Sequence, residues 1–102
     1  MRRGFSKYHA VRTEVNGIMF ASKKEAARYW VLFLMNKAGN ISKLELQPVF
    51  KFPCGFTHKA DFRYFENGKE VVEDAKGFQT RIFKMKAKML KAHFPEIELK
   101  IT

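Results

Sequence analysis

Two short segments around an Asn-Gly pair predict a β-hairpin near the start of the chain. They cover residues 11–15, which begin and end with valine, and residues 18–20, which are all apolar, and Asn16-Gly17 stands between them. An Asn-Gly pair in this setting is a strong signal for a two-residue turn, because both residues tolerate the positive φ angles that such a turn needs. We therefore expect two short antiparallel strands here.

The next segment predicts a helix. Ser22-Lys23-Lys24-Glu25 has the spacing of a helix capping box. Residues 26–38 then favour a helix, and Gly39-Asn40 marks its end. The centre of this helix, Trp30 to Met35, is apolar on nearly every side. We therefore expect it to be buried on more than one side, or to bury one side in a dimer.

The remaining pattern predicts three strands, a second helix and a final strand. These elements cover residues 44–52, 58–66, 69–75, 80–94 and 97–101. Asn67-Gly68 marks another two-residue hairpin turn, Thr80 is a candidate N-cap, and Pro95 follows the end of the helix. The order is an N-terminal β-hairpin followed by α-β-β-β-α-β. It predicts an α+β fold with helices on the faces of a sheet.

The size of the chain fits one domain with one core. It has 102 residues, of which 46% are hydrophobic and 11 are Phe. This is too aromatic for a disordered chain, so we expect a single domain over residues 1–102, with residues 1–10 as a flexible basic arm. No apolar run approaches the ~20 residues of a membrane span, and no signal peptide is visible. A single cysteine, Cys54, fits a reducing compartment. We expect a cytoplasmic protein without membrane contact.

The charge indicates the class of partner. Twenty Lys and Arg against ten Asp and Glu give a formal net charge of +10, which attracts polyanions and above all nucleic acid. The alternative is a basic domain that is merely soluble or that docks on ribosomes. Cys54 and His58 make only half of a zinc site, and no glycine-rich phosphate loop is present. We expect neither structural zinc nor a nucleotide cofactor.

Two carboxylates are predicted to face each other across the second hairpin. If Asn67 and Gly68 form its turn, Asp61 lies directly opposite Asp74. Side chains alternate along a strand, which gives one face with Lys59, Asp61, Arg63, Val72, Asp74 and Lys76. The other face is mostly apolar, is expected to meet a helix, and carries Ala60, Phe62, Tyr64, Val71, Glu73 and Ala75.

Opposed carboxylates repel, so a compensating charge is expected beside them. A Mg²⁺ or Mn²⁺ ion suits this place, because such ions are held by one or two carboxylates and by phosphate oxygens. Lys76 on the same face adds an ammonium group, and together these groups supply what phosphodiester hydrolysis requires. The alternative is a solvated face on which Asp61 and Asp74 pair with neighbouring lysines and arginines.

These residues resemble the core motif of the PD-(D/E)XK nuclease superfamily, with Asp61 followed across a hairpin by Asp74-Ala75-Lys76. Nearly the whole chain is similar to a small phage- and prophage-encoded branch, described as a domain of unknown function. The similar stretches are Ser22-Lys23-Lys24-Glu25-Ala26, Leu44-Glu45-Leu46-Gln47-Pro48, Ala60-Asp61-Phe62 and Glu73-Asp74-Ala75-Lys76-Gly77 with Thr80 beyond. Each is short, but their order and spacing together are fairly specific.

The resemblance implies a restriction-endonuclease-like fold, with a mixed four-stranded sheet flanked by helices. It implies that Asp61 and Asp74 bind the metal and that Lys76 is the catalytic lysine. Ala60 stands where the motif has proline, a replacement that is common and costs little. Glu73 is an alternative ligand, since a β-bulge would exchange it with Asp74.

Two further candidates follow from the resemblance. Glu25 matches an acidic residue that many members carry on the first helix, where it binds metal or a water on the metal. Its alternative role is to complete the capping box with Ser22. Gln47 is a candidate for contact with such a water or with a substrate phosphate, and its alternative is an ordinary polar strand residue.

The second helix carries a basic stripe. Arg81, Lys84, Lys88 and Lys91 fall on one side, and no acidic residue occurs between Ala75 and Pro95. A solvated helix usually mixes signs, so we expect this stripe, with Thr80, to contact nucleic-acid phosphates; plain solvation is the alternative. Two apolar stripes share the helix. Phe83, Ala87, Leu90 and Phe94 suit packing on the sheet, and Ile82, Met85, Met89 and Ala92 suit core packing, on the first helix or on a second subunit.

Together these features predict a Mg²⁺- or Mn²⁺-dependent DNA endonuclease. Because so small a domain has little surface for reading sequence, we expect structure-selective cleavage of branched DNA, such as recombination or repair intermediates in a bacterial host. A homodimer would supply two cuts. The alternatives are a non-catalytic nucleic-acid-binding module with the same fold and, last, an RNA- or ribosome-associated protein.

Overall fold

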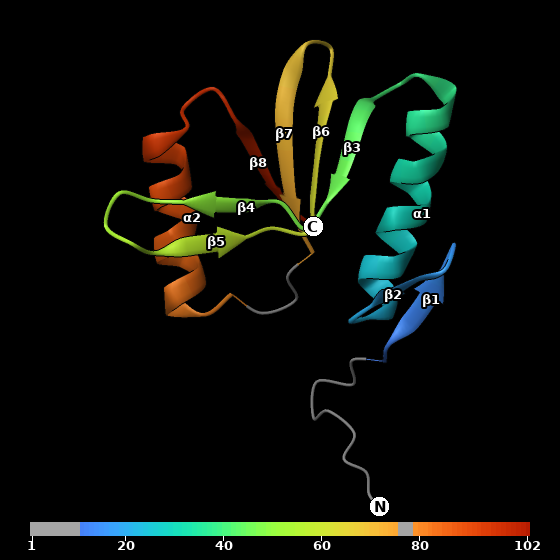
Figure 1. Ribbon diagram of the computed structural model, residues 1–102, viewed down its shortest axis with the longest axis horizontal. Coiled ribbons are helices and arrows are strands. Elements are labelled where there is room, and N and C mark those ends of the chain that lie inside the picture. The colour runs from blue at the N-terminus through green and yellow to red at the C-terminus, as the bar shows by residue number, and fades with distance from the viewer. Residues whose placement is uncertain (1–10, 76–78) are drawn as a thin grey trace, which may run out of the picture.

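Two helices pack against opposite faces of a mixed four-stranded sheet (Figure 1). The computed structural model describes residues 11–75 and 79–102. The predicted basic arm, residues 1–10, and Lys76 therefore lie outside the described residues. In chain order the elements are β1 (Thr13–Val15), β2 (Ile18–Phe20), α1 (Lys23–Ala38), β3 (Ser42–Leu46), β4 (Val49–Lys51), β5 (Thr57–Lys59), β6 (Phe62–Glu66), β7 (Lys69–Asp74), α2 (Arg81–His93) and β8 (Glu98–Ile101).

Both predicted hairpin turns are confirmed. Asn16 and Gly17 have φ angles of 54° and 77°, and Asn67 and Gly68 have φ angles of 53° and 78°. Two successive positive φ angles are what a tight hairpin turn needs, which explains the Asn-Gly pairs. In the second hairpin Glu66 pairs with Lys69, so the predicted register is present.

Both predicted helices are confirmed, together with their caps. The hydroxyl of Ser22 accepts a hydrogen bond from the Glu25 amide at 3.1 Å, and that of Thr80 accepts one from the Phe83 amide at 3.0 Å. α1 begins at Lys23, three residues before the predicted start. It ends at Ala38, and the next residue, Gly39, caps it with a φ of 86°, which favours a residue without a Cβ atom.

The central sheet has the strand order β3-β6-β7-β8. β7 pairs antiparallel with β6 and parallel with β8, so the sheet is mixed, as predicted. Its two faces bury separate cores. The core under α1 contains Phe20, Ala26, Tyr29, Leu32, Ile41, Phe62, Tyr64 and Val71. The core under α2 contains Phe50, Phe52, Ala60, Val72, Leu90 and Ile97.

The predicted strands over residues 44–52 and 58–66 are wrong as continuous strands. The first breaks at Gln47-Pro48, where Gln47 has a φ of 51° and proline has no amide hydrogen for a sheet. The second breaks at Ala60-Asp61. The outer halves form an additional hairpin, β4–β5, which the predicted element order lacks. Ala60 consequently belongs to the core under α2, not to that of Phe62 as predicted.

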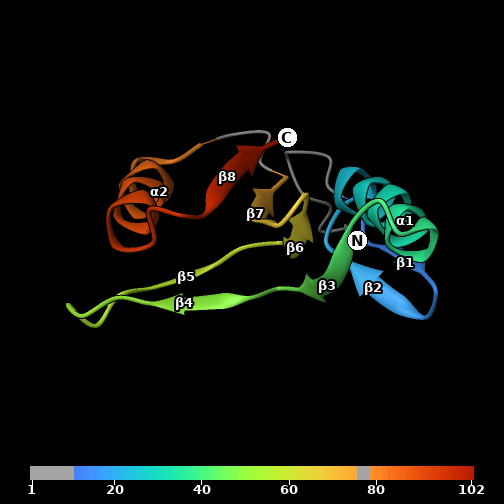
Figure 2. The ribbon, with the colours of Figure 1, turned by 90° about the horizontal axis from the view of Figure 1, so that it is seen from above.

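The β4–β5 hairpin leaves the sheet and packs on α2, as the two views show (Figures 1 and 2). Ring contacts join Phe50 to Phe94 and Phe52 to His93, with centroids 5.5 and 5.6 Å apart. These apolar contacts explain the break in the strands, because the outer halves bury their side chains on α2 instead of extending the sheet.

α1 buries one side only. Ala26, Tyr29 and Leu32 are buried, whereas Trp30 and Leu34 on the outer side are nearly half exposed. The expectation that the helix is buried on more than one side is therefore wrong. Tyr29 and Leu32 follow one another at helical spacing, and this single stripe suffices to cover the sheet. No helix among the described residues is long and apolar enough to cross a membrane.

Candidate active site

All four strands of the central sheet have one of their ends at the same side of the sheet, which we call the site edge. It is the edge at which the C-terminus lies in Figure 1. The Gln47 amide donates to the Asp61 carbonyl at 2.9 Å, the Asp61 amide to the Glu73 carbonyl at 3.0 Å, and the Thr102 amide to the Asp74 carbonyl at 2.9 Å. These backbone hydrogen bonds fix the ends of β3, β6, β7 and β8 relative to one another.

Asp61 lies at the bend between β5 and β6. Its Oδ2 accepts a hydrogen bond from the amide of Ala75 at 2.7 Å. Ala75 directly follows Asp74, so the structure brings the Asp61 carboxylate beside the end of β7. The carboxylate is half-buried and thus keeps contact with solvent.

Asp74 is the last residue of β7 and is fully buried. Its Oδ2 lies 3.0 Å from Nε2 of His58, but its Oδ1 has no hydrogen-bond partner among the described residues. A buried carboxylate oxygen without a partner is unfavourable by several kcal/mol. Such an oxygen atom is a suitable ligand for a cation.

Glu73 lies on the opposite face of the sheet and has both of its oxygens in use. Oε1 accepts from Nε of Arg28 at 2.8 Å, and Oε2 accepts from Nη2 of Arg28 at 2.6 Å and from the hydroxyl of Tyr64. Burial alone would raise the pKa of Glu73, but the hydrogen bonds from Arg28 and Tyr64 outweigh it and hold the pKa below its usual value. Glu73 is therefore an ion-paired carboxylate.

The partners of Glu73 shift in the matching direction. The hydrogen bond to Glu73 raises the pKa of Arg28, so its guanidinium stays charged. Burial raises the pKa of the Tyr64 hydroxyl, and the hydrogen bond to Glu73 raises it further, which keeps the hydroxyl protonated as a donor. The network is thus fixed in one protonation state at neutral pH.

Glu25 lies in the first turn of α1 and is buried. Arg28 follows three residues later on the same side of the helix, and Arg28 reaches Glu73 next to Asp74. Glu25 is consequently on the side of α1 that faces the end of β7. Ser22 forms its half of the capping box.

Gln47 occupies the bend between β3 and β4, not a strand interior. Its amide holds the Asp61 carbonyl, and its side chain is exposed. The described residues include no group of three or more His, Cys, Asp or Glu side chains placed to hold a metal ion. Lys76, the remaining predicted member of the site, is outside the described residues.

α2 presents its predicted basic stripe to solvent. Arg81, Lys84, Lys88 and Lys91 are all exposed, and none forms an ion pair with a described residue. The predicted packing stripe is confirmed, with Phe83 and Leu90 buried and Ala87 and Phe94 half-buried.

The second apolar stripe of α2 is only partly buried. Ile82, Met85 and Ala92 are exposed, so the expectation of core packing is wrong for these three residues. Met89 alone of the stripe packs against the core under α2.

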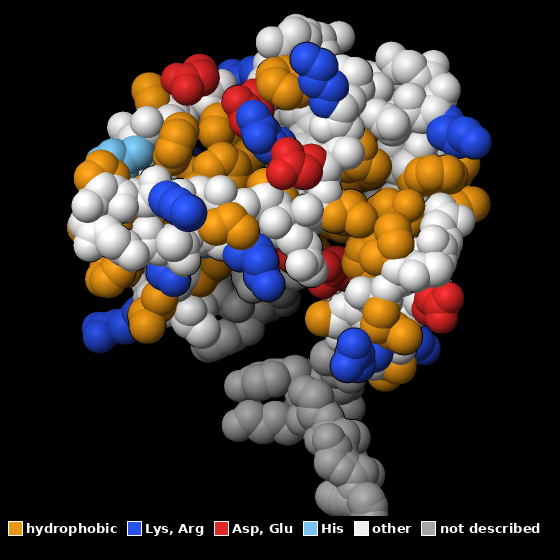
Figure 3. All heavy atoms as spheres, in the orientation of Figure 1, with side chains coloured by type: hydrophobic (Ala, Val, Ile, Leu, Met, Phe, Trp, Pro, Cys, Tyr) orange, Lys and Arg blue, Asp and Glu red, His pale blue; other side chains and the backbone are white. Residues whose placement is uncertain are grey.

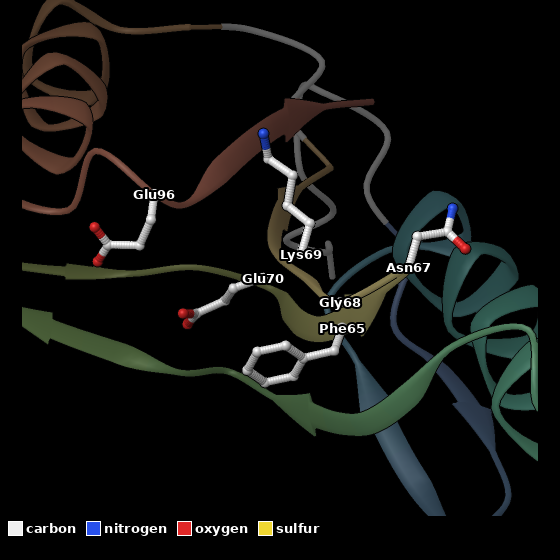
Figure 4. Close-up of a pocket in the computed structure, with 6 residues that line it drawn as sticks. All are labelled: Phe65, Asn67, Gly68, Lys69, Glu70 and Glu96. Carbon is white, nitrogen blue, oxygen red and sulfur yellow. The ribbon is translucent and has the colours of Figure 1, made fainter.

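Acidic and basic side chains lie together at the end of the molecule opposite the site edge, as the face in Figure 3 shows. Two of its carboxylates form ion pairs, Glu70 with Arg63 and Glu66 with Lys100. A hollow of about 430 Å³ lies at this end, around the tip of the β6–β7 hairpin (Figure 4). It is lined by Phe65, Asn67, Gly68, Lys69, Glu70 and Glu96. No predicted site residue lines it, so Asp61 and Asp74 are not part of this hollow.

Three residues of the site were not predicted from the sequence. Arg28 and Tyr64 hold Glu73, and His58 contacts Asp74. The spacing of Glu25 and Arg28 on one helical face was the available signal for Arg28. His58 had no comparable signal, because its contact with Asp74 depends on the unpredicted β4–β5 hairpin.

The comparisons with known proteins give a family but no activity. No curated protein sequence matches the chain. One protein family, described as a protein of unknown function (DUF1064), matches residues 5–102. Nearly the whole chain is covered by this match, and the protein therefore belongs to the DUF1064 family.

Proposed function

We propose that this protein is a Mg²⁺- or Mn²⁺-dependent endonuclease that hydrolyses phosphodiester bonds of DNA, and that it is a PD-(D/E)XK nuclease with a restriction-endonuclease-like fold. The observation that carries the proposal is Oδ1 of Asp74, a buried carboxylate oxygen without a partner among the described residues, at the end of β7. The Asp61 carboxylate lies beside the same strand end.

The donor set fits a hard cation. Mg²⁺ and Mn²⁺ prefer oxygen ligands and are held by one or two carboxylates together with phosphate oxygens. Asp61 and Asp74 would hold the ion, and Glu25, buried on the side of α1 that faces the end of β7, is the third candidate. When bound, the ion supplies charge neutralisation on the phosphate and a water of lowered pKa.

Asp74 is the better candidate of the two acidic neighbours on β7. Both oxygens of Glu73 already accept hydrogen bonds from Arg28 and Tyr64. A metal at Glu73 would have to displace a charged guanidinium, whereas Oδ1 of Asp74 has no such partner to lose. This difference supports the role that the resemblance assigns to Asp74.

The chain's own side chains account for the remaining chemistry. Lys76 follows Asp74 by two residues in the sequence, and its ammonium group would stabilise the negative charge that develops on the phosphate. Gln47, exposed at the bend beside Asp61, would donate a hydrogen bond to a phosphate oxygen. Arg28 and Tyr64 would act indirectly, because they hold the end of β7 through Glu73.

The exposed cations of α2 favour DNA binding along this helix. They begin at Arg81 near the end of β7, and none of them forms an ion pair with a described residue. At the opposite end of the sheet, Glu66 pairs with Lys100 and Glu70 pairs with Arg63. A polyanion is attracted to the unpaired cations of α2. We further propose branched DNA as the substrate, a second copy of the chain as the source of a second cut, and the bacterial cytoplasm as the location.

A cleavage assay with labelled DNA tests the proposal. Wild type, Asp61→Asn and Asp74→Asn would be compared on linear duplex, single-strand, flap and four-way-junction DNA with EDTA, Mg²⁺ or Mn²⁺. We expect cleavage by wild type that requires metal and is lost in both variants. Glu96→Gln, beside the hollow at the opposite end of the sheet, is the matched control and should cleave like wild type. Cleavage that persists in Asp74→Asn would overturn the assignment of the site.

A non-catalytic nucleic-acid-binding module is the second candidate. It is favoured by the basic stripe of α2, which needs no carboxylate to bind DNA. This candidate predicts DNA binding by wild type and by Asp74→Asn alike, with no cutting under any metal.

A further inference from the structure

We infer that His58 is a positioning residue, which holds the Asp74 carboxylate through Oδ2 and so directs Oδ1 toward the metal. The inference rests on the proposed function. It concerns a residue that the sequence analysis assigned to no site.

The contact between the two residues is buried on both sides. Nε2 of His58 lies 3.0 Å from Oδ2 of Asp74. His58 is 5% exposed and Asp74 is not exposed at all. Since a carboxylate only accepts hydrogen bonds, Nε2 carries the hydrogen. A hydrogen bond to a charged acceptor in a buried place is among the stronger ones in proteins.

The β4–β5 hairpin places the imidazole there. His58 pairs with Phe50 in the hairpin, and both side chains point inward, away from solvent. The ring also contacts Phe83 of α2, with centroids 5.7 Å apart. The imidazole is thus held between the hairpin and α2, and its freedom to turn is small.

The consequence for Asp74 is an oriented carboxylate. With Oδ2 bound to His58, rotation about the last side-chain bond is blocked, and Oδ1 is left as the oxygen without a partner among the described residues. Residues that orient a ligand in this way are a regular part of metal sites, and their loss typically lowers metal affinity roughly 10- to 100-fold.

A structural role is the competing explanation, since His58 also fills space in the core under α2. Two substitutions separate the explanations. His58→Phe keeps a ring against Phe83 but removes the donor. His58→Gln gives up the ring but keeps a donor of similar reach. His93→Phe is the matched control, because His93 also contacts the hairpin, through Phe52, and is exposed.

The test measures Mn²⁺ binding to the full chain by calorimetry or by the EPR signal of free Mn²⁺, with the unfolding midpoint of each variant taken in EDTA. We expect His58→Phe to bind Mn²⁺ roughly 10- to 100-fold more weakly, and His58→Gln and His93→Phe to stay within a few-fold of wild type. If His58→Phe does not fold, His58→Asn takes its place, because its shorter side chain withdraws the donor.

Two outcomes overturn the inference. In one, both His58 variants bind Mn²⁺ like wild type. In the other, the loss of affinity follows the loss of stability and is as large for Gln as for Phe. Failure of the proposed function gives a different result. Wild type would then either bind no Mn²⁺ or bind it with an affinity that Asp74→Asn leaves unchanged. In that case the inference falls with the function.

Discussion

Glu73 and Asp74 are neighbours on β7, so their carboxylates lie on opposite faces of the sheet, and they differ in their hydrogen-bond partners. Glu73 is bound by Arg28 and Tyr64 through both oxygens, whereas Asp74 leaves Oδ1 without a partner among the described residues. Both side chains are fully buried. One carboxylate therefore has both oxygens bound within the fold, and the other has one oxygen that could bind the proposed metal.

Substitution of Asp74 is expected to separate metal binding from stability. Asp74→Asn removes the charge at nearly the same volume, so Mn²⁺ binding should fall by more than the roughly 10- to 100-fold typical of an orienting residue. The unfolding midpoint in EDTA should change little, because asparagine keeps an oxygen that can accept from His58, and the weaker hydrogen bond is offset by the loss of a buried charge. Calorimetry and thermal unfolding on one sample check both. A lower midpoint with unchanged Mn²⁺ affinity would contradict this.

Substitution of Glu73 is expected to act in the opposite way. Glu73→Gln leaves Arg28 without its anion and should lower the free energy of unfolding by about 2 kcal/mol. Arg28 keeps partial contact with water, so the loss stays below the value for a fully buried pair. Glu45→Gln, in an exposed pair with Arg63, is the control and should change the free energy of unfolding by less than about 1 kcal/mol. Urea unfolding at neutral pH measures both.

The Glu73 network also predicts how stability depends on pH. Its pKa in the folded protein is lower than the ordinary value of 4.5, so the unfolded chain takes up this proton more readily. The contribution is complete above pH 4.5 and is lost as the pH falls below that value through the lower pKa of the folded state. Wild type and Glu73→Gln should therefore converge in stability as urea unfolding is repeated at decreasing pH. A gap that stays constant down to pH 3 would exclude this linkage.

The basic stripe of α2 should contact phosphates. Lys84→Gln with Lys88→Gln should weaken DNA binding and reduce the slope of log K against log salt by about 2, because each phosphate contact contributes roughly 0.9. Lys69→Gln, at the tip of the β6–β7 hairpin, is the control. Fluorescence anisotropy over a salt series gives the slope. Equal slopes for the double variant and wild type would show that these lysines are only solvated.

Gln47 permits a test that separates backbone from side chain. Its φ of 51° is favourable for glycine, so Gln47→Gly should keep or raise the stability by up to about 1 kcal/mol. If the side-chain amide of Gln47 contacts phosphate, the same variant should bind DNA several-fold more weakly. Gln47→Asn, which tolerates the same φ, serves as the intermediate case.

The sequence predicted the elements that depend on neighbouring residues. Asn67-Gly68 fixes its own turn, and Ser22 and Thr80 cap their own helices, so no distant contact was needed. The breaks at Gln47-Pro48 and Ala60-Asp61 were missed, because they depend on the packing of Phe50 and Phe52 against α2. Alternating residues in an outward hairpin have the same pattern as a continuing strand.

The site was predictable in part for the same reason. The hairpin register follows from its turn, and it puts Asp61 beside the end of β7. The partners of Glu73 were not predictable, since Arg28 lies 45 residues away in sequence and on another element. These partners, and not the motif, decide whether Asp74 or Glu73 has a carboxylate oxygen without a partner among the described residues.

The outer side of α1 gives the protein a natural fluorescent reporter. Trp30 is the one tryptophan of the chain, is 44% exposed, and stacks on Phe33. Its emission should respond when a second copy covers this helix, by a shift to shorter wavelength as protein concentration rises. DNA bound along α2, on the opposite face of the sheet, should leave the emission unchanged. One spectrum thus distinguishes self-association from DNA binding without any label.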